Sequence, residues 1–330
     1  MPKVIRFHEL GGPQSLKFED VPTPQPKEGE VRLKVKAVGL NRAEALFTRG
    51  KYLEQPKLPA GLGYEAAGTV DAVGPGVDQS WLGKQVATIP AFSMNQYPML
   101  GEEVLAPVHA LGEYPPNLTP VQAAAIWMQY FTAYGGLIQI GQVAAGDYVV
   151  ITAASSSVGL AAIEITKAEG GIAIATTRKR DKASELLKLG ADHVIATEEE
   201  DIVARVKEIT GGKGARVIFD PVAGPFVDKL AAIASNRGII VEYGSLSQQP
   251  TQFPLGVALL KGLTLRGYIL WEVTGDPKKL AVGKKYFYDR LADGRFHPKV
   301  DKTFPFAQTV QAYEYLESNQ QIGKVVITVP

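Results

Sequence analysis

The 330-residue chain contains no cysteine. Disulfide bonds, thiolate zinc sites and a cysteine nucleophile are therefore excluded, although this absence alone does not indicate a redox compartment. Histidine is also scarce, and the four histidines, His8, His109, His193 and His297, lack the paired spacing of a metal site. We expect each to be a structural or surface residue, and we predict no metal.

The chain also lacks an excess of either charge and a long apolar run. Lys and Arg number 35 against 34 for Asp and Glu, so the net charge gives no reason to expect nucleic acid or an acidic membrane surface as a partner. No apolar run approaches the ~18 residues of a membrane span. The amino terminus leads straight into a predicted strand without an apolar signal segment. We therefore expect a cytoplasmic protein that binds neither nucleic acid nor membrane.

The length of the chain predicts two domains, because 330 residues are many for a single core. Residues 1–121 have short strands such as Val31–Val38, many Gly and Pro, and few helical stretches, which predicts a β-rich domain in the form of a small distorted barrel. Residues 271–330 end in a strand, Lys324–Thr328, and are expected to return to this domain. Residues 122–270 form the second predicted domain.

The segment Asp147–Gly159 is the most informative part of the chain, because an apolar strand runs into a small-residue turn and then into a helical pattern. Such a strand-turn-helix aims backbone N–H groups and the positive end of a helix dipole at one point, which suits a pyrophosphate. Ser155, Ser156 and Ser157 stand where the usual fingerprint has glycines, and each would cost about 1 kcal/mol if its position needed a positive φ. An ordinary β-α turn is the alternative reading of this motif alone.

Apolar strands alternate with amphipathic helices from this turn as far as residue 270. The further strands are predicted at 171–177, 193–196, 215–220, 238–243 and 263–270. Six strands with crossover helices predict an α/β Rossmann fold, a doubly wound parallel six-stranded sheet. Ligands of such sheets bind beyond the carboxyl ends of the strands, so the loops at Ser155, Thr177, Val222 and Gly244 are expected to line one crevice.

The loop after the second predicted strand indicates which dinucleotide would bind. An NAD-selective site normally ends this strand in Asp or Glu, about 20 residues past the turn. Here the cations Arg178–Arg180 follow the strand, and Asp181 is expected to cap the next helix. Cations at the positive end of a helix dipole are unfavourable unless an anion lies between them. We predict that Arg178, with Lys179 or Lys182, holds the 2′-phosphate of NADP; a solvated basic turn is the alternative.

Seven ordered motifs, this turn included, resemble the signature of the medium-chain dehydrogenase/reductase superfamily. The most extensive of the others is Gly63–Gly76. The rest are, in chain order, Val38–Glu44, Thr132–Tyr134, Gly190–Val194, Phe219–Val222 and Gly323–Val326. The resemblance covers essentially the whole chain and implies the same two-domain fold.

The resemblance also bears on metal. Zinc-bearing relatives hold a catalytic zinc through a Cys, a His and a third ligand, whereas the matching positions here are Asn41, Tyr64 and, near the third, Met128. None of these is a credible zinc ligand. The chain therefore resembles most the zinc-free quinone oxidoreductases, including zeta-crystallin, and related alkenal and enone reductases. This implies hydride transfer from NADPH to a quinone or to the β-carbon of an α,β-unsaturated carbonyl, acceptors that need little polarisation by a Lewis acid.

The resemblance suggests two catalytic residues, Asn41 and Tyr52. The Asn41 amide would donate to the acceptor oxygen, or the residue only closes a turn after a strand. The Tyr52 hydroxyl would donate a proton or a hydrogen bond, or its ring only packs on the substrate. Many quinone reductases carry a second tyrosine where this chain has Leu46, so a scheme with two such tyrosines is in doubt. Glu44 and Glu65 lie near the lost zinc position, either as structural hydrogen-bond partners or as proton relays.

The resemblance and the sheet together give the remaining site residues. The cofactor contacts are expected from Thr132, Ser155, Ser156, Ser157, Val158, Thr177, Arg178, Lys182, Val222, Tyr243, Gly244 and Lys324. An apolar substrate wall is expected from Phe47, Tyr64, Phe92, Trp127, Met128 and Trp271, although most of these residues fit an ordinary core equally well.

Two other functions stay open. One is reduction of an alkenal, enone or enoyl thioester double bond, and the other is a non-catalytic, crystallin-like protein that keeps NADPH affinity. Family members often form homodimers through the edge strand of the nucleotide domain, and residues 263–270 are the candidate edge.

Overall fold

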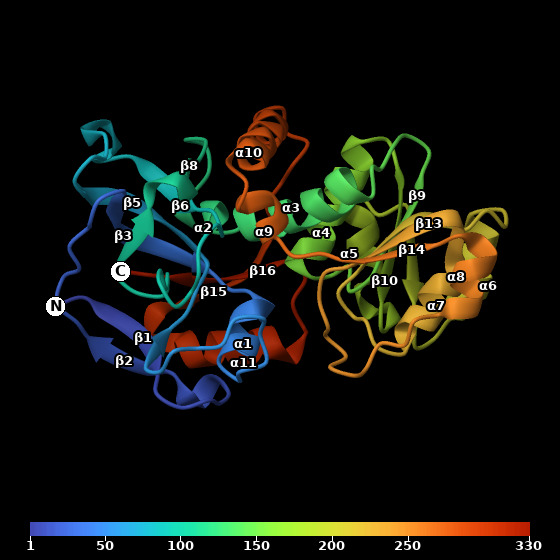
Figure 1. Cartoon of the computed structure of the whole chain (residues 1–330), viewed down its shortest axis with the longest axis horizontal. Helices are drawn as coiled ribbons and strands as arrows, with labels where there is room; N and C mark the ends of the chain where they lie inside the picture. The colour runs from blue at the N-terminus through green and yellow to red at the C-terminus, as the bar shows by residue number, and fades with distance from the viewer. The chain divides into compact units, whose positions relative to one another are not determined.

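The computed structural model describes residues 1–330 and divides into two compact units (Figure 1). The first unit comprises Met1–Met128, Thr274–Lys284 and Pro298–Pro330, and the second comprises Gln129–Val273 and Lys285–His297. The second unit thus includes residues 285–297, which the sequence assigned to the first domain. Where independently folding domains begin and end stays a prediction.

The second unit is built on a parallel six-stranded sheet with the order β11-β10-β9-β12-β13-β14. Its strands are β9 (Tyr148–Ile151), β10 (Ile172–Thr177), β11 (His193–Ala196), β12 (Ala215–Asp220), β13 (Ala234–Glu242) and β14 (Thr264–Gly267). Its helices include α4 (Ser157–Ala168), α5 (Ala183–Lys188), α6 (Ile202–Ile209), α7 (Phe226–Ile233) and α8 (Leu255–Lys261). The predicted doubly wound sheet is confirmed.

The last strand of this sheet is shorter than predicted. We expected it to run over 263–270, but β14 ends at Gly267. The backbone N–H of Ile269 donates to the Glu272 carboxylate at 3.3 Å, and the helix α9 (Trp271–Thr274) begins two residues later. The apolar run therefore contains a strand and the start of a helix, which hydrophobicity alone does not separate.

One face of the sheet packs against α6 and α7. Five strands each contribute one fully buried aliphatic residue to a single cluster with these helices. The five are Val150, Ile174, Ile195, Ile218 and Ile240. Because every strand runs in the same direction, the residues after this layer come together at the carboxyl edge of the sheet.

The first unit contains an open sheet with the order β15-β16-β3-β5-β6-β8, in which β7 also pairs with β3. Its strands are β3 (Glu30–Gly39), β5 (Glu65–Val73), β6 (Gln85–Thr88), β7 (Glu103–Pro107), β8 (Leu111–Glu113), β15 (Val300–Pro305) and β16 (Lys324–Thr328). A second sheet joins β2 (Lys17–Asp20), β1 (Lys3–Phe7) and β4 (Ala60–Gly61). Since β16 pairs with β3, the carboxyl-terminal segment returns to this unit as predicted.

Helices of the first unit bring distant segments onto this sheet. They include α1 (Arg42–Phe47), α2 (Pro120–Ala123) and α11 (Thr309–Ser318), while α3 (Trp127–Tyr134) and α10 (Pro277–Ala292) each contribute residues to both units. A Cβ on Gly39 would lie 1.9 Å from the Ala124 carbonyl oxygen, so only glycine lets α2 approach β3 this closely. No helix of the chain is both long enough and apolar enough to span a bilayer.

Glu164, a half-buried carboxyl group on α4, gives a first testable prediction. The Tyr130 hydroxyl donates to Glu164, the backbone N–H of His297 donates to it at 3.0 Å, and burial raises the pKa of Glu164 to about 7. Because the pKa of Glu164 in the folded protein is higher than the unfolded value near 4.3, its protonated form stabilises the fold. This stabilisation is fully present below the unfolded pKa and is lost as pH rises through about 7. We therefore expect Glu164→Gln to raise the urea midpoint relative to the parent protein far more at pH 8 than at pH 5.

The control for this measurement is the exposed Glu198. Glu198→Gln is expected to leave the midpoint unchanged at both pH values. A Glu164→Gln variant whose advantage does not grow between pH 5 and pH 8 would show that this carboxyl does not titrate in that range.

Candidate functional site

The turn between β9 and α4 is the candidate cofactor site of the second unit. Ser156 is the N-cap of α4, and its hydroxyl accepts the backbone N–H of Gly159 at 3.0 Å. None of the three serines has a positive φ; the left-handed residue of the turn is Ala153, with φ 46°. The backbone of the serines is therefore unstrained. Ala153, two residues before Ser155, has the unfavourable left-handed conformation instead.

Gly159 makes the start of α4 fit closely against the turn. A Cβ at this position would lie 2.6 Å from both the Cα and the carbonyl oxygen of Ala154. Glycine therefore brings the helix N-terminus next to the end of β9. The first N–H groups of a helix have no partner within it, so Ser157 and Val158 present the donors that suit a diphosphate.

A cationic loop follows β10. Arg178 and Lys179 are exposed, and the side chain of neither makes a hydrogen bond or ion pair. Arg180 instead lies 3.7 Å from Glu199 and 3.6 Å from Glu200. Arg178 is thus the first unpaired cation after Thr177, and its role in binding a 2′-phosphate stays a prediction.

Lys182 and Asp181 are neighbours in this loop, and Asp181 differs from its prediction. Lys182 Nζ lies 3.3 Å from Ser155 Oγ, so the loop and the β9-α4 turn are in contact. The expected N-cap role of Asp181 is wrong: this residue lies inside the 3-10 turn Arg180–Lys182, and its carboxylate accepts the N–H of Lys182 at 3.0 Å. Its carboxylate still complements the helix dipole from the first turn.

The carboxyl edge of the sheet carries a polar group that the sequence did not reveal. The Thr152 hydroxyl donates to Asp220, and the N–H of Ala223 donates to the same carboxylate at 2.6 Å. Glu242 is paired in register with Asp220, and its burial and the nearby Asp220 raise the pKa of Glu242 to about 9. In the sequence, the available signal for this polar group was an acidic residue at the end of each of two predicted strands.

The other predicted cofactor residues of this unit are found at the same edge or on α3. Val222 and Gly244 follow β12 and β13, and the ring of Tyr243 stacks on Phe219 with centroids 4.0 Å apart. Thr132 is buried on α3. Their cofactor contacts stay predictions.

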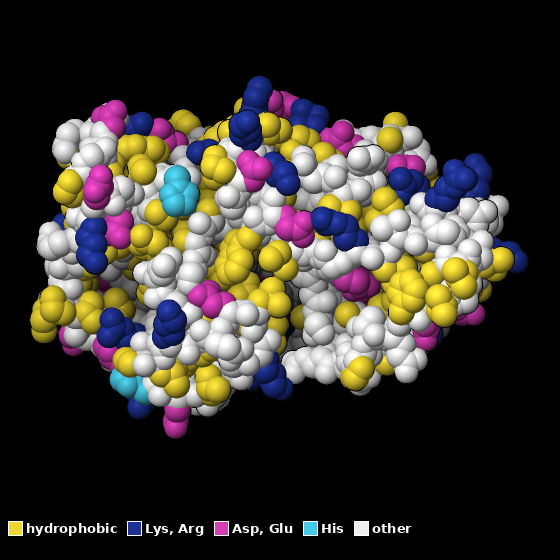
Figure 2. All heavy atoms as spheres, viewed as in Figure 1, with side chains coloured by type: hydrophobic (Ala, Val, Ile, Leu, Met, Phe, Trp, Pro, Cys, Tyr) yellow, Lys and Arg dark blue, Asp and Glu magenta, His cyan; other side chains and the backbone are white.

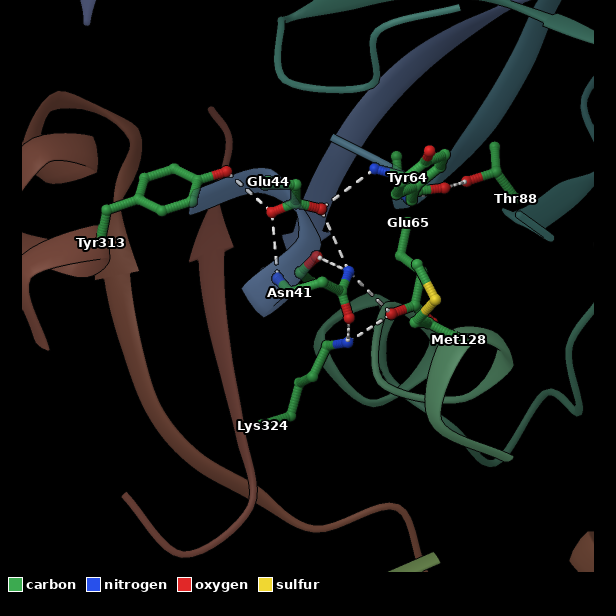
Figure 3. Close-up of polar contacts among 10 residues, drawn as sticks. Asn41, Glu44, Tyr64, Glu65, Thr88, Met128, Tyr313 and Lys324 are labelled. Carbon is green, nitrogen blue, oxygen red and sulfur yellow. Dashed lines mark hydrogen bonds and ion pairs between the residues drawn. The ribbon is translucent and has the colours of Figure 1, made fainter. Parts of the chain in front are cut away.

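A buried polar network in the first unit surrounds Asn41 (Figure 3). Asn41 is the N-cap of α1, and its backbone N–H donates to the Glu44 carboxylate at 3.0 Å. Its side-chain amide donates to the Gly39 carbonyl and to Glu44, both at 3.1 Å. Its side-chain oxygen accepts from Lys324 Nζ at 2.7 Å. The structure therefore shows the turn-closing role, with both amide hydrogens already engaged.

Lys324 and Glu65 form a fully buried ion pair in this network, with side chains 0% and 1% exposed. The other oxygen of Glu65 accepts the backbone N–H of Met128 at 2.8 Å. One carboxylate thus joins β5, β16 and the start of α3 (Figure 3). The ammonium group predicted to bind the cofactor is engaged within the first unit instead.

Glu44 is the second buried carboxyl of the network. It accepts the Tyr313 hydroxyl at 2.8 Å and the backbone N–H of Tyr64 at 3.2 Å, while burial raises the pKa of Glu44. The Asn41 and Tyr313 hydrogen bonds act against this rise in pKa, and every partner of the two Glu44 oxygens is an N–H or O–H donor, as an ionised carboxylate requires. Both glutamates accept backbone N–H groups, and a role of either as a proton relay stays a prediction.

Tyr52 lies at the edge of a row of aromatic rings in the first unit. Its half-buried ring is 6.4 Å from that of Tyr64, which in turn lies 6.1 Å from Phe92. Burial raises the pKa of Tyr52, so its hydroxyl is protonated at neutral pH and able to donate. The structure thus brings together Tyr52 and two residues of the predicted substrate wall.

The other residues of that wall are dispersed. Phe47 is fully buried against Phe7, with ring centroids 5.8 Å apart, and is a core residue. Trp127 and Met128 are buried at the start of α3, and Trp271 is half-buried in the second unit.

Comparisons with known proteins cover nearly the whole chain. Residues 27–159 match the family described as alcohol dehydrogenase GroES-like domain, and residues 157–282 match the zinc-binding dehydrogenase family. The chain is 32% identical to quinone oxidoreductase 1 of Escherichia coli K12 over 98% of both chains, and 30% identical to a 2-haloacrylate reductase of a Burkholderia species over 97% of both. The crystal structure of Escherichia coli quinone oxidoreductase complexed with NADPH superposes with a TM-score of 0.91, at 30% identity and 99% coverage of each chain.

The second matched family is described as zinc-binding, but this chain lacks the residues of a zinc site. No group of three or more His, Cys, Asp or Glu side chains is arranged to hold a metal ion. The donor set around Asn41 consists of an amide, two carboxyl groups and a buried ammonium, and the ammonium already neutralises one carboxylate.

Proposed function

The chain belongs to the zinc-free quinone oxidoreductase branch of the medium-chain dehydrogenase/reductase superfamily, and on this premise we propose that it reduces quinones or related conjugated carbonyls with NADPH. Full-length identity of 32% to a quinone oxidoreductase is the observation that carries the proposal. The unpaired Arg178 and the Ser156-capped helix support the choice of cofactor.

The proposed reaction needs residues that hold the cofactor and a residue that donates a proton. NADPH, when bound, supplies the hydride. The N-terminus of α4 would hold its diphosphate, and Arg178 with Lys182 would hold its 2′-phosphate. The Tyr52 hydroxyl would donate the proton that completes the two-electron reduction, because a protonated phenol is available at neutral pH. Asn41 would act by fixing the start of α1 rather than by touching the substrate.

The role of Tyr52 is tested by removing its hydroxyl. Tyr52→Phe is expected to reduce kcat for an enone by about a hundredfold if the phenol is the general acid, with the KM for NADPH unchanged. Steady-state kinetics at saturating NADPH measures this. Unchanged kinetics would leave Tyr52 as a residue that only packs on the substrate.

The substrate class has two candidates within this chemistry. The similarity to quinone oxidoreductases favours a quinone, whereas the similarity to a protein named 2-haloacrylate reductase favours an activated double bond. The decay of NADPH absorbance with a quinone and with a linear enone, in parallel reactions, separates them. Faster turnover of the quinone would support a quinone substrate, and faster turnover of the enone would support reduction of an activated double bond.

We also propose that the protein is a homodimer joined along β14. This strand pairs only with β13, so its other edge is open within the chain. Beside it, α8 exposes Leu259 and Leu260, 74% and 83% accessible, and Figure 2 shows hydrophobic side chains gathered over this region. An unpaired edge next to exposed leucines is typical of a self-association surface.

Sedimentation tests the dimer directly. We expect a mass near twice 35.5 kDa for the parent protein and a mass near 35.5 kDa after the double change Leu259→Asp and Leu260→Asp. The control Val282→Asp changes another exposed apolar residue, 60% accessible and part of the first unit, and should leave the mass unchanged. A parent mass near 35.5 kDa would contradict the proposal.

A cytoplasmic location and the absence of nucleic-acid binding are further parts of the proposal. The balance of 35 basic against 34 acidic residues supports the second. Cell fractionation and a DNA-cellulose binding assay test the two expectations.

A further inference from the structure

The loop that carries Tyr52 is held to a neighbouring turn by side chains rather than by strand pairing. Residues 51–59 contain no helix and no strand. A loop without a backbone ladder of its own depends on contacts with other segments for its conformation. The position of the proposed proton donor is therefore decided by those contacts.

Asn95 makes three of these contacts. Its side-chain amide donates to the Glu54 carboxylate at 2.8 Å and to the Gln55 carbonyl at 2.9 Å. Its side-chain oxygen accepts the backbone N–H of Lys57 at 2.8 Å. One asparagine side chain thus uses both of its amide hydrogens and its oxygen on three residues of the loop.

Glu54 is the side chain of the loop that meets this asparagine. The same Glu54 oxygen that accepts from Asn95 also accepts the Ser93 hydroxyl. Ser93 Oγ in turn accepts the backbone N–H of Asn95 at 3.1 Å. Glu54, Ser93 and Asn95 together form a hydrogen-bonded group, the Glu54 clamp, that ties the loop to the turn at residues 93–95.

Tyr52 lies between the Glu54 clamp and a second fixed point. The backbone N–H of Lys51 donates to the Leu46 carbonyl at 2.9 Å, which ties the start of the loop to α1. The Tyr52 carbonyl accepts the side-chain amide of Gln55 at 3.3 Å. The chain is therefore held immediately before Tyr52 and again two residues after it.

The turn that carries Ser93 and Asn95 also carries part of the aromatic row around Tyr52. Phe92, directly before Ser93, is buried, and its ring lies 6.1 Å from that of Tyr64. The Tyr64 ring lies 6.4 Å from that of Tyr52. The Glu54 clamp thus sets the loop against the rings beside which the Tyr52 phenol lies.

We propose that Asn95 and Glu54 are positioning residues for Tyr52, and that the Glu54 clamp holds the Tyr52 hydroxyl where it donates to the substrate. The inference rests on the proposed function, in which Tyr52 supplies the proton. A general acid must be within hydrogen-bond distance of the oxygen it protonates, and misplacement by about 1 Å can cost about a hundredfold in rate. The clamp contains none of the predicted cofactor residues, so it acts on proton transfer and not on NADPH binding.

Asn95→Ala tests the Glu54 clamp in two backgrounds, with an enone and saturating NADPH. In the parent enzyme we expect kcat to fall about tenfold, with the KM for NADPH unchanged. In the Tyr52→Phe background the same change should lower kcat by less than about twofold, because the hydroxyl that it positions is absent. A purely structural role would instead lower kcat equally in both backgrounds.

An exchange of the two polar groups tests the hydrogen bond itself. Asn95→Asp places a second carboxylate beside Glu54 and should lower kcat at least as much as Asn95→Ala. The further change Glu54→Gln supplies an amide that donates to the new carboxylate, so most of the lost kcat should return. Gln96→Ala is the matched control, because Gln96 is the exposed neighbour of Asn95 and its replacement should leave kcat unchanged.

Two results would overturn the inference while leaving Tyr52 as the donor. One is a kcat of Asn95→Ala that is unchanged, or that falls equally in the parent and Tyr52→Phe backgrounds. The other is an exchange variant as slow as Asn95→Asp alone. If Tyr52→Phe itself matches the parent enzyme, the donor role of Tyr52 and this inference are both contradicted, whereas turnover of the parent enzyme shows separately whether the proposed function stands.

Discussion

Arg178→Ala is expected to weaken NADPH binding by about 10- to 100-fold while changing NADH binding by no more than about twofold. The guanidinium follows β10 directly and is exposed with no partner in the chain. A 2′-phosphate would give it charge-assisted hydrogen bonds that NADH cannot form. Titration of intrinsic fluorescence with each cofactor measures both dissociation constants.

Arg180→Ala provides the control for this prediction. Arg180 lies two residues away but is within 4 Å of Glu199 and Glu200, so its charge is already compensated. Its replacement is expected to change NADPH and NADH affinity little and equally. Equal losses of NADPH and NADH affinity in Arg178→Ala would contradict the 2′-phosphate assignment and favour the alternative, a solvated basic turn.

Lys324→Met is expected to lower the free energy of unfolding by about 3–5 kcal/mol, the usual cost of leaving one member of a buried ion pair alone. The ammonium is 0% exposed and contacts Glu65 and the side-chain oxygen of Asn41. Its removal leaves the Glu65 carboxylate buried next to Glu44 without a counter-charge. Urea unfolding at pH 7 gives the loss in stability.

A second substitution separates loss of charge compensation from loss of packing. In the double variant Lys324→Met with Glu65→Gln the unpaired charge is absent, so part of the stability should return. The exposed Lys17 offers a control, since Lys17→Met removes a charge on β2 without breaking a buried contact. A loss below about 1 kcal/mol in the single variant would contradict the stabilising role given to this ion pair.

The sequence predicted the parallel sheet well because its signals are local. Each strand of the second unit is a short apolar run, and each crossover helix has its own amphipathic pattern. The end of β14 could not be read in this way, because Tyr268–Leu270 is as apolar as the strand before it. The turn after β9 was recognised, but the residue with positive φ is Ala153, which no glycine marks.

The polar network of the first unit was less predictable, because its contacts join residues far apart in the chain. Asn41 and Lys324 are 283 residues apart, and only the pairing of β16 with β3 brings them together. The resemblance to a family identified both residues but not their partners. A motif shows that a side chain matters, whereas the fold decides which of its atoms remain free for a ligand.

The rate of NADPH oxidation by the purified protein, followed at a fixed quinone concentration and repeated with NADH, is the most direct test of the central claim. We expect turnover that requires the quinone, consumes one NADPH for each two-electron reduction, and has a higher kcat/KM for NADPH than for NADH. NADPH binding without oxidation of the cofactor by either a quinone or an enone would contradict the account and favour a non-catalytic protein.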